Sequence, residues 1–376
     1  MVASSALTPN PAGKSTQAVR VLVVDDSAVI RGLISRWLEE DPGITVAGSA
    51  VNGRHAVTIA QEKPFDVAIL DIEMPEMDGL TALPLLVKAQ PGLKVLMAST
   101  LTRRNAEISL KAMSLGAADY VPKPETMRDG KSPAEFRTEL IEKVKALGTP
   151  AASKRAPGIV PRTATRTLAS AAPAKITLRA PSAVKPQVIA IGSSTGGPQA
   201  LFEVVKVLAP ALDLPVVITQ HMPAAFTAIL AEHIRKASGL ACAEGKTGDV
   251  LKPRQVYVAP GGQHMLVERR NGQPTIVLSD APPENYCKPA VDPMFRSLAA
   301  AYGSGVLGVI LTGMGQDGRE GGRAIVGAGG TILAQDEATS VVWGMPGAVA
   351  QAGLCSAVVP LAQIVPEVLK LTRRTP

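Results

Sequence analysis

Short apolar runs alternate with stretches of helical periodicity through the first part of the chain. Uninterrupted apolar strands of this length are typical of a parallel sheet whose two faces are both covered by helices. The pattern therefore predicts an α/β domain with a five-stranded parallel sheet. The predicted strands span residues 21–24, 44–47, 67–70, 95–98 and 119–121, and the clearest helices span 28–39 and 134–147.

The same alternation returns in the second half and predicts a second, doubly wound and mostly parallel α/β domain. Its middle, 245–278, is rich in Gly, Pro and strand-forming residues, so we expect an antiparallel excursion or long loops there. The predicted strands are 188–191, 216–219, 256–258, 275–278, 308–311 and 331–334, with helices at 199–208, 226–236 and 293–301.

The formal net charge of +7 is concentrated between these two regions. Segment 149–186 is rich in Ala, Pro, Ser and Thr, lacks Asp and Glu, and shows no steady apolar period. We interpret it as an extended basic linker, which separates a flexible tail (1–18) and a first domain (19–148) from a second domain (187–376). The number of basic residues in this segment equals the whole excess of Lys and Arg (39) over Asp and Glu (32) in the chain. These residues are Lys154, Arg155, Arg162, Arg166, Lys175, Arg179 and Lys185.

Composition argues against several function classes. No apolar run approaches the roughly 18 residues that span a bilayer, and the polar N-terminus lacks the apolar centre of a secretion signal. We therefore expect a cytoplasmic protein that is not inserted into a membrane. The three cysteines form no C-x-x-C pair and indicate neither a disulfide framework nor a zinc site. With the excess charge on a linker and only five Phe and four Tyr, we expect no nucleic-acid binding.

Acidic residues follow two strands of the first domain. Asp25 and Asp26 end the first strand and Asp71 ends the third, so the three carboxylates should meet at one sheet edge and attract Mg²⁺. Ser99 and Lys123 follow two further strands. This set can bind Mg²⁺ and a phosphoryl group, with Asp71 as the acceptor. Singly, such acids more often cap helices or face solvent, but the convergence of the set favours function.

A serine in the second domain has the surroundings of a nucleophile. Ser194 follows a buried strand directly, between Gly192 and Gly196, in a strand–turn–helix context. His221 follows the next strand and is the candidate base. Asp317 lies in a glycine-rich turn after a later strand, where it can orient the imidazole, although an Asp there can also simply cap a helix. Backbone N–H groups near Thr195 and Met314 are candidate donors to an oxyanion.

The alternatives in this domain are weaker. His233 lies inside a helical stretch and is expected at the surface, and His264 follows a loop. Ser193 lacks the flanking glycines that Ser194 has. A phosphate-binding loop at 192–197 is disfavoured, because no Lys-Ser/Thr follows and the spacing is not G-x-G-x-x-G.

Taken together, the first-domain motifs resemble those of response-regulator receiver domains, which have a flavodoxin-like fold. The matching runs are 23–27, 70–79, 99–100 and 123–124. The resemblance implies that Asp71 is phosphorylated and that Asp25, Asp26, Asp71 and the backbone carbonyl of Glu73 hold Mg²⁺. It also implies that Ser99 and Lys123 contact the phosphoryl group and that Tyr120 reorients between states.

The second-domain motifs resemble the catalytic domain of the chemotaxis methylesterase (CheB) family. The matching runs are 191–197, 220–222, 259–262 and 311–318. The resemblance implies a triad of Ser194, His221 and Asp317 that hydrolyses glutamate methyl esters on chemoreceptors and deamidates certain receptor glutamines, with no cofactor for the esterase reaction. The stretch 285–292 departs from many relatives, in which it is richer in His and Arg. We interpret its Cys287 as a small packed thiol.

These expectations combine into a phosphorylation-gated serine esterase. The unphosphorylated first domain is expected to cover Ser194, and phosphorylation at Asp71 to uncover it. The implied partners are a CheA-type histidine kinase as phosphodonor and methylated chemoreceptors as substrate, and we expect a monomer. Two alternatives remain open: a response regulator whose output is DNA or protein binding, which the basic linker supports, and a degenerate esterase that acts as an adaptor.

Overall fold

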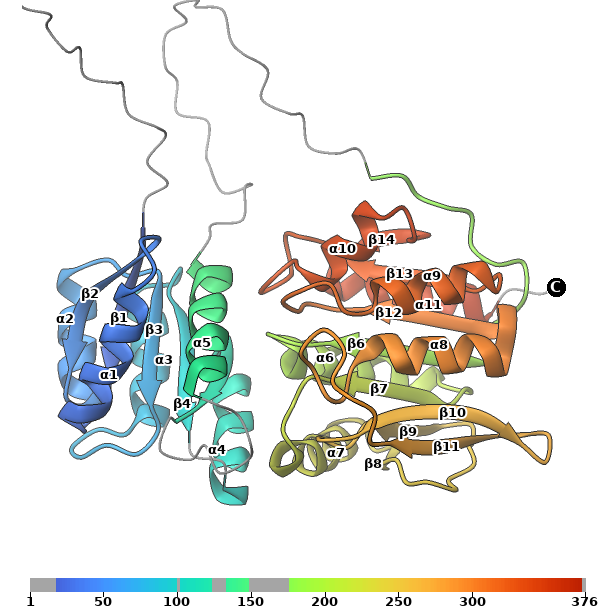
Figure 1. Ribbon diagram of the computed structural model, residues 1–376, viewed down its shortest axis with the longest axis horizontal. Coiled ribbons are helices and arrows are strands. Elements are labelled where there is room, and N and C mark those ends of the chain that lie inside the picture. Colours follow the sequence, from blue (N-terminus) through green and yellow to red (C-terminus); the bar gives the residue numbers. More distant parts are fainter. Residues whose placement is uncertain (1–17, 100–101, 124–132, 149–175, 374–376) are drawn as a thin grey trace, which may run out of the picture.

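The computed structural model describes residues 18–99, 102–123, 133–148 and 176–373, which form two α/β units (Figure 1). The N-terminal unit is called the receiver unit below, and the C-terminal unit the catalytic unit. No helix in the described part of the chain is long and apolar enough to cross a bilayer.

The receiver unit is built on five parallel strands in the order β2-β1-β3-β4-β5. The chain steps from β1 to one neighbour and then returns to the other, so the direction of winding reverses between β1 and β3. Ligands bind at the carboxyl ends of the strands at such a reversal. The strands are β1 (Val19–Val24), β2 (Ile44–Ala50), β3 (Val67–Asp71), β4 (Lys94–Ser99) and β5 (Asp119–Pro122).

Helices cover both faces of this sheet. Buried side chains of α1 and α5 form one apolar cluster with it, and those of α2, α3 and α4 lie in another. Polar caps fix where helices begin: the side chain of Ser27 accepts from Ile30 N–H, and that of Asp78 from Thr81 N–H. The helices are α1 (Ala28–Glu39), α2 (Gly53–Glu62), α3 (Gly79–Ala89), α4 (Arg103–Ser114) and α5 (Pro133–Gly148).

The catalytic unit contains a seven-stranded sheet in the order β14-β13-β12-β6-β7-β9-β8, and each neighbouring pair is parallel. Here the winding reverses between β6 and β12, at the centre of the sheet. The strands are β6 (Val188–Ser193), β7 (Val216–Gln220), β8 (Ala241–Glu244), β9 (Gln255–Val258), β12 (Val306–Ile310), β13 (Thr331–Gln335) and β14 (Ala357–Val359).

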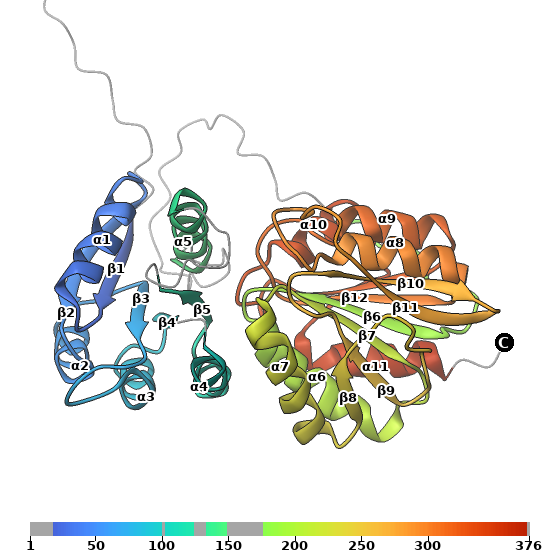
Figure 2. The same ribbon diagram turned by 60° about the horizontal axis from the view of Figure 1, so that its bottom comes forward.

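Two layers cover the catalytic sheet (Figure 2). Side chains of α6, α7 and α11 pack on one face, and those of α8, α9, α10 and an antiparallel hairpin of β10 and β11 pack on the other. The hairpin strands are β10 (His264–Arg270) and β11 (Gln273–Ser279). The helices are α6 (Gly197–Leu208), α7 (Ala224–Ser238), α8 (Val291–Tyr302), α9 (Arg319–Gly327), α10 (Met345–Gln351) and α11 (Leu361–Thr372).

The predicted strands are present in both units, with bounds shifted by a few residues. The expected antiparallel excursion is the β10–β11 hairpin. The sequence pattern did not predict β8 and β14, which are the two edges of the catalytic sheet; they are only four and three residues long, and Cys242 is their one buried position. An edge strand lacks a neighbour on one side, so its sequence carries a weaker signal.

The predicted linker lies largely outside the described residues, as does the predicted tail up to residue 17. Its described end, from residue 176, runs along the catalytic unit. Arg179 N–H donates to the carbonyl of Cys355 at 2.9 Å, and Ser182 N–H donates to Thr331 Oγ1 at 2.9 Å. The domain boundaries stay predictions.

The two units meet through α4 and β5 of the receiver unit. Helix α4 packs against α6 and α7, and Figures 1 and 2 both show α4 and α5 on the side of the receiver unit that faces the catalytic unit. Tyr120 of β5 stacks on Phe226 of α7, with ring centroids 4.4 Å apart and ring planes 11° apart. The buried clusters of the two units are thus continuous.

Candidate active site

Ser194 lies in the turn that joins β6 to α6, at the carboxyl end of the central strand. Its backbone is held from both sides: Ser194 N–H donates to the carbonyl of Thr312 (3.1 Å), and the Ser194 carbonyl accepts from Gln220 Nε2 (2.9 Å). Gln220 also accepts from Ser193 Oγ at 2.7 Å. The side chain of Gln220 therefore fixes the turn of Ser194 to the strand that precedes His221, a role that the sequence analysis missed.

Two glycines make this turn possible. Gly196 has φ 76°, a left-handed conformation that favours glycine. Gly313 lies against the serine itself, because a Cβ at Gly313 would stand 2.9 Å from Ser194 Cβ and 2.5 Å from Met345 Sδ. The loop after β12 thus packs directly on Ser194.

His221 and Asp317 form a close pair at the same sheet edge. His221 follows β7 directly, Asp317 precedes α9, and His221 Nε2 lies 2.7 Å from Asp317 Oδ2. Strands β12, β6 and β7 are neighbours, so the three candidate residues come from three adjacent strand ends. The structure thus brings His221 and Asp317 together and places Ser194 at the end of the strand between β12 and β7.

Asp317 is buried and accepts several hydrogen bonds that favour its ionised form. Val291 N–H donates to Oδ2 at 2.6 Å, and Asp292 N–H and Gly318 N–H donate to Oδ1 at 3.0 and 2.9 Å. Burial alone would raise the pKa of Asp317, but the bond to His221 and these N–H groups lower it. Asp317 is therefore held as a carboxylate, which its alternative role as a simple helix cap would not require.

Cys287 occupies the other side of the His221 ring. Its Sγ lies 3.3 Å from His221 Nδ1. Among the hydrogen bonds of the described residues, none joins Ser194 Oγ to His221. The interpretation of Cys287 as a packed thiol misses this contact, because the sequence does not show which loop faces the imidazole.

The candidate oxyanion donors also lie at this edge. Within the described residues, no hydrogen bond uses the backbone N–H of Thr195 or of Met314. Thr312 anchors the region: its Oγ1 donates to the Thr195 carbonyl at 2.9 Å, and it accepts from Val341 N–H at 3.0 Å. Thr312 belongs to the glycine-rich motif around Asp317, so its position was visible in the sequence while its role was not.

The other two histidines of the catalytic unit have different surroundings. His233 lies on α7, as expected from its helical pattern. His264 is buried: its Nε2 lies 3.0 Å from the Pro282 carbonyl, and its Nδ1 accepts from Ala290 N–H at 3.1 Å. These bonds fix the loop that precedes α8, which is a structural role.

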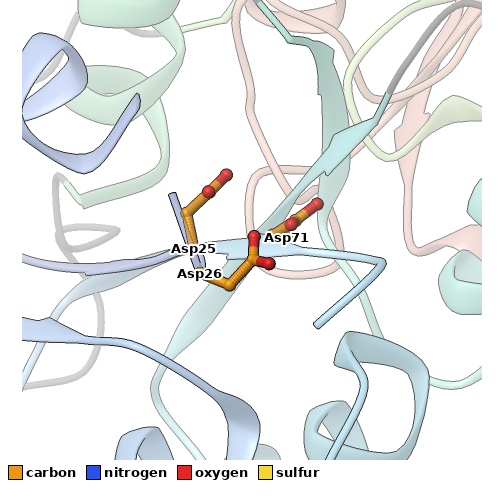
Figure 3. A group of neighbouring side chains, drawn as sticks. All are labelled: Asp25, Asp26 and Asp71. Atoms are coloured by element: carbon orange, nitrogen blue, oxygen red, sulfur yellow. The ribbon is translucent and has the colours of Figure 1, made fainter. Parts of the chain in front are cut away.

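The three acids of the receiver unit meet at the reversal between β1 and β3. Asp25, Asp26 and Asp71 each offer a carboxylate oxygen within 4.8 Å of the others, and Figure 3 shows Asp25 and Asp26 beside Asp71. Burial raises the pKa of Asp71 to about 6, although Lys123 opposes this. Crowded carboxylates of this kind suit a hard divalent cation such as Mg²⁺.

Lys123 bridges two of these acids. Its Nζ lies 2.7 Å from Asp71 Oδ2 and 3.0 Å from Asp25 Oδ2. Ser99 is the last residue of β4, but its side chain lies outside the described part of the structure. Glu73 follows β3 by two residues and lines a pocket together with Asp26. The predicted phosphoryl-contact residues are therefore gathered here as far as they are described.

The receiver unit contacts the candidate active site itself. Thr195 Oγ1 donates to Asp119 Oδ2 of β5 at 2.7 Å, and both groups are buried. Met314 and Val342 pack with the apolar cluster of the receiver unit. Tyr120, the predicted switch residue, is buried in the contact with α7. The residues that flank Ser194 thus lie against the receiver unit.

Known protein families match two separate parts of the chain. Residues 189–368 match the family described as CheB methylesterase, and residues 21–132 match the family described as response regulator receiver domain. A protein of Rhodopseudomonas palustris (strain ATCC BAA-98 / CGA009) is named protein-glutamate methylesterase/protein-glutamine glutaminase of group 2 operon. It is 51% identical over 384 residues, which cover 98% of each chain. A protein of Azospirillum brasilense, named protein-glutamate methylesterase/protein-glutamine glutaminase, is 54% identical over 385 residues, which cover 97% of each chain.

Two solved structures from Thermotoga maritima resemble the two units separately. The CheB methylesterase catalytic domain is 38% identical and has a TM-score of 0.49, and the match covers 50% of this chain and 100% of that chain. The response regulator domain of CheB is 37% identical and has a TM-score of 0.31, and the match covers 34% of this chain and 95% of that chain.

Proposed function

Because this chain belongs to the CheB methylesterase family, with a response regulator receiver domain before the catalytic domain, we propose that it is a phosphorylation-gated serine esterase. Its proposed substrates are glutamate methyl esters on chemoreceptors, and it releases methanol. It also deamidates specific receptor glutamines. These two activities are those that the names of its relatives state.

The proposed acylation step begins at Ser194. His221 takes the proton of the Ser194 hydroxyl while the oxygen attacks the ester carbonyl. Backbone N–H groups of Thr195 and Met314 donate to the oxyanion that develops. His221 then returns the proton to the departing methoxide, so that methanol leaves and an acyl-enzyme remains. With a glutamine substrate the leaving group is ammonia.

Deacylation repeats the same steps with water. His221 takes a proton from water, the resulting hydroxide attacks the acyl-enzyme, and the proton goes back to Ser194. Asp317 keeps one orientation and one tautomer of His221 through both halves of the reaction. Glutamate, now unesterified, is released.

One observation carries this proposal: the pair of His221 Nε2 and Asp317 Oδ2, 2.7 Å apart, at the strand end next to Ser194. The carboxylate is held by three backbone N–H groups from two different segments. A helix-capping Asp would need only the bond to its own helix. The additional bonds support an orienting role for Asp317.

The receiver unit is proposed to accept a phosphoryl group on Asp71. Asp25, Asp26, Asp71 and the backbone carbonyl of Glu73 would hold Mg²⁺, which when bound supplies positive charge for the phosphoryl oxygens. Lys123, which already pairs with Asp71, would then contact the phosphoryl group together with Ser99. The phosphodonor is proposed to be a CheA-type histidine kinase.

Gating follows from the contact between the units. Thr195, Met314 and Phe226 all contact the receiver unit, so a protein substrate cannot approach the turn of Ser194 from that side. Phosphorylation adds negative charge at the carboxyl ends of the strands, the edge at which β5 also ends. Tyr120 of β5 is the proposed link between this edge and the surface that contacts the catalytic unit. When the receiver unit moves away from the catalytic unit, the site becomes accessible. We place the protein in the cytoplasm as a monomer.

The substitution Ser194→Ala tests the esterase proposal. We expect it to abolish methanol release from methylated receptor membranes, because no oxygen nucleophile remains at that turn. Phosphate incorporation from a small acyl phosphate should be unchanged. Ser238→Ala at the end of α7 is the matched control and should keep the wild-type rate. Equal methanol release by Ser194→Ala and wild type would reject the proposal.

A further inference from the structure

The proposed base nitrogen of His221 faces a sulfur atom. Nε2 pairs with Asp317, so Nδ1 is the nitrogen that can take the serine proton. Nδ1 lies 3.3 Å from Cys287 Sγ, and no hydrogen bond from Ser194 Oγ reaches it among the described residues. In this arrangement the proposed base nitrogen contacts the Cys287 sulfur and not the hydroxyl of the proposed nucleophile.

A tight turn carries Cys287 to this place. Glu284 N–H donates to the Cys287 carbonyl at 3.1 Å, and Cys287 N–H donates to the Glu284 carbonyl at 2.9 Å. Asn285 and Tyr286 between them have φ 51° and 61°, as in a type I′ turn. Asn285 Nδ2 donates to Asp317 Oδ1 at 3.0 Å. One carboxylate therefore fixes both the imidazole and the turn that presents the sulfur.

We propose that Cys287 is a positioning residue for His221, an inference that rests on the esterase function proposed above. In the resting enzyme its sulfur holds the base nitrogen and keeps the imidazole protonated. Ser194 Oγ can form a hydrogen bond with Nδ1 only after the contact between Nδ1 and the sulfur is broken. Cys287 thus restrains the reaction from inside the site, independently of the receiver unit.

The proton balance of this pair is simple. The protonated imidazole donates from Nδ1 to Cys287 Sγ. An imidazolium has no lone pair for the serine proton, so the esterase waits until the Nδ1 proton leaves for solvent. Burial lowers the pKa of His221, but the charge on Cys287 and the contacts with Asp317 outweigh it and raise the pKa to about 10.

The charged groups around His221 are few. Cys287 faces Nδ1 and Asp317 faces Nε2, while Asp292 and Arg296 of α8 lie beyond Asp317. From the receiver unit, Asp119 contacts Thr195. Removal of the sulfur therefore removes one of the two groups that raise the pKa of the imidazole.

Cys287 also differs from the other two cysteines. Cys242 and Cys355 are buried, and burial raises the pKa of each thiol to about 12. Cys287 is partly exposed and lies against a proton acceptor. Cys287 should therefore be the thiol that alkylating reagents reach first.

The pH profile of methanol release tests the proposal. Full-length wild type, Cys287→Ala and Cys287→Ser are activated with a small acyl phosphate and Mg²⁺, and kcat/KM is measured on methylated receptor membranes. Without the sulfur contact, which raises the pKa of His221, the imidazole loses its proton at lower pH. We expect the ascending limb of kcat/KM to move down by about one pH unit in both variants. If Cys287 only stabilised its loop, its loss would change kcat/KM by the same factor at every pH and would not shift the ascending limb. An unshifted limb in both variants therefore overturns the proposal.

Alkylation by iodoacetamide gives a second measurement. The Cys287 sulfur forms a bond to the acetamide carbon, the carbon–iodine bond breaks, and iodide leaves with the electron pair. Wild type should take the label first at Cys287 and lose methanol release, whereas Cys287→Ala should stay active in the reagent. His221→Gln should slow labelling of Cys287 at pH 7 on the order of tenfold, because the sulfur loses the neighbouring cation, which favours release of a thiol proton. Labelling that is equally fast without His221 contradicts the proposal.

Ser194→Ala separates the two levels of inference. If that variant keeps its methanol release, the esterase proposal fails and this inference fails with it. If that variant is inactive while the limb stays in place for both Cys287 variants, only the role of Cys287 is rejected.

Discussion

At the scale of single residues, burial acts on the carboxylates of the two units in opposite ways. Asp317 is stabilised as an anion by His221 and by backbone N–H groups, so its pKa is lowered despite burial. Asp71 has Lys123 beside it, yet burial dominates and its pKa rises to about 6. Asp317 is thus in the ionised form that can orient an imidazolium. The ionised form of Asp71 is destabilised until a cation or a phosphoryl group changes its surroundings.

This contrast predicts how stability depends on pH. The pKa of Asp71 is about 6 in the folded state against an ordinary value of 3.8, so its ionisation opposes folding above pH 6, progressively less between pH 6 and 4, and not at all below. After discounting for solvent screening, Asp71→Asn should raise the free energy of unfolding by about 1–2 kcal/mol at pH 7.

Urea unfolding in a metal chelator measures this difference at pH 7 and at pH 4, where the gain should be near zero. The exposed Asp213→Asn is the matched control and should show no gain at either pH. An equal gain at both pH values would rule out ionisation of Asp71 as the cause.

The sequence predicted the candidate catalytic residues but not the contacts that set their protonation. Ser194, His221 and Asp317 follow apolar strands, and parallel strand ends converge, so their proximity was predictable. The contact of Cys287 with His221 was not, because it depends on a two-residue turn and on one bond from Asn285. Gln220 and Thr312 were missed for the same reason: their roles consist of side-chain bonds between loops.

At the scale of elements, the nucleophile turn is held by close backbone packing. The loop after β12 presses on Ser194 at Gly313, while Thr312 and Gln220 hold the turn through hydrogen bonds. Both loops stand at the point where the sheet reverses its winding. The fold thus places the proposed nucleophile and the proposed orienting carboxylate in loops at neighbouring strand ends.

The substitution Gly313→Ala should therefore disturb the site. The new methyl group would stand 2.5 Å from Met345 Sδ and 2.9 Å from Ser194 Cβ, so the turn must move. We expect a loss of about 1–3 kcal/mol in stability and a fall in methanol release of at least tenfold. Thermal unfolding and the methanol assay check both effects.

Gly327→Ala is the control for this change. Gly327 ends α9, and a Cβ there meets nothing within 4 Å, so alanine should be neutral or stabilising by about 0.5–1 kcal/mol. If both variants behave alike, close packing at Gly313 is not what holds Ser194.

At the scale of the whole molecule, the receiver unit is joined to the catalytic unit by a few specific contacts. Asp119 connects them most directly, because it accepts from Thr195 and pairs with Lys143 of α5 at 3.0 Å. The two α/β units and their parallel sheets were predicted from the sequence, but the faces that meet were not. Apolar periodicity reports that a face is buried, not which partner buries it.

Loss of Asp119 should release the restraint without phosphorylation. A hydrogen bond to a charged group contributes about 1.5–3 kcal/mol, so Asp119→Ala should raise methanol release by the unphosphorylated protein roughly tenfold. Lys143 keeps Glu139 as a partner. Asp41→Ala, which removes the partner of Lys145 within the receiver unit, is the control and should leave the low rate unchanged. An unphosphorylated Asp119→Ala protein with the wild-type rate would refute this restraint.

The coupling between the receiver unit and the candidate active site, to which the bond from Thr195 to Asp119 contributes, acts in both directions. Thermodynamic linkage requires that if phosphate on Asp71 favours an open site, then anything that occupies the open site favours phosphate on Asp71 by the same factor. A receptor segment seated at Ser194 would thus favour the phosphorylated state that admitted it. At equilibrium, a larger fraction of the engaged enzyme than of the idle enzyme would carry phosphate.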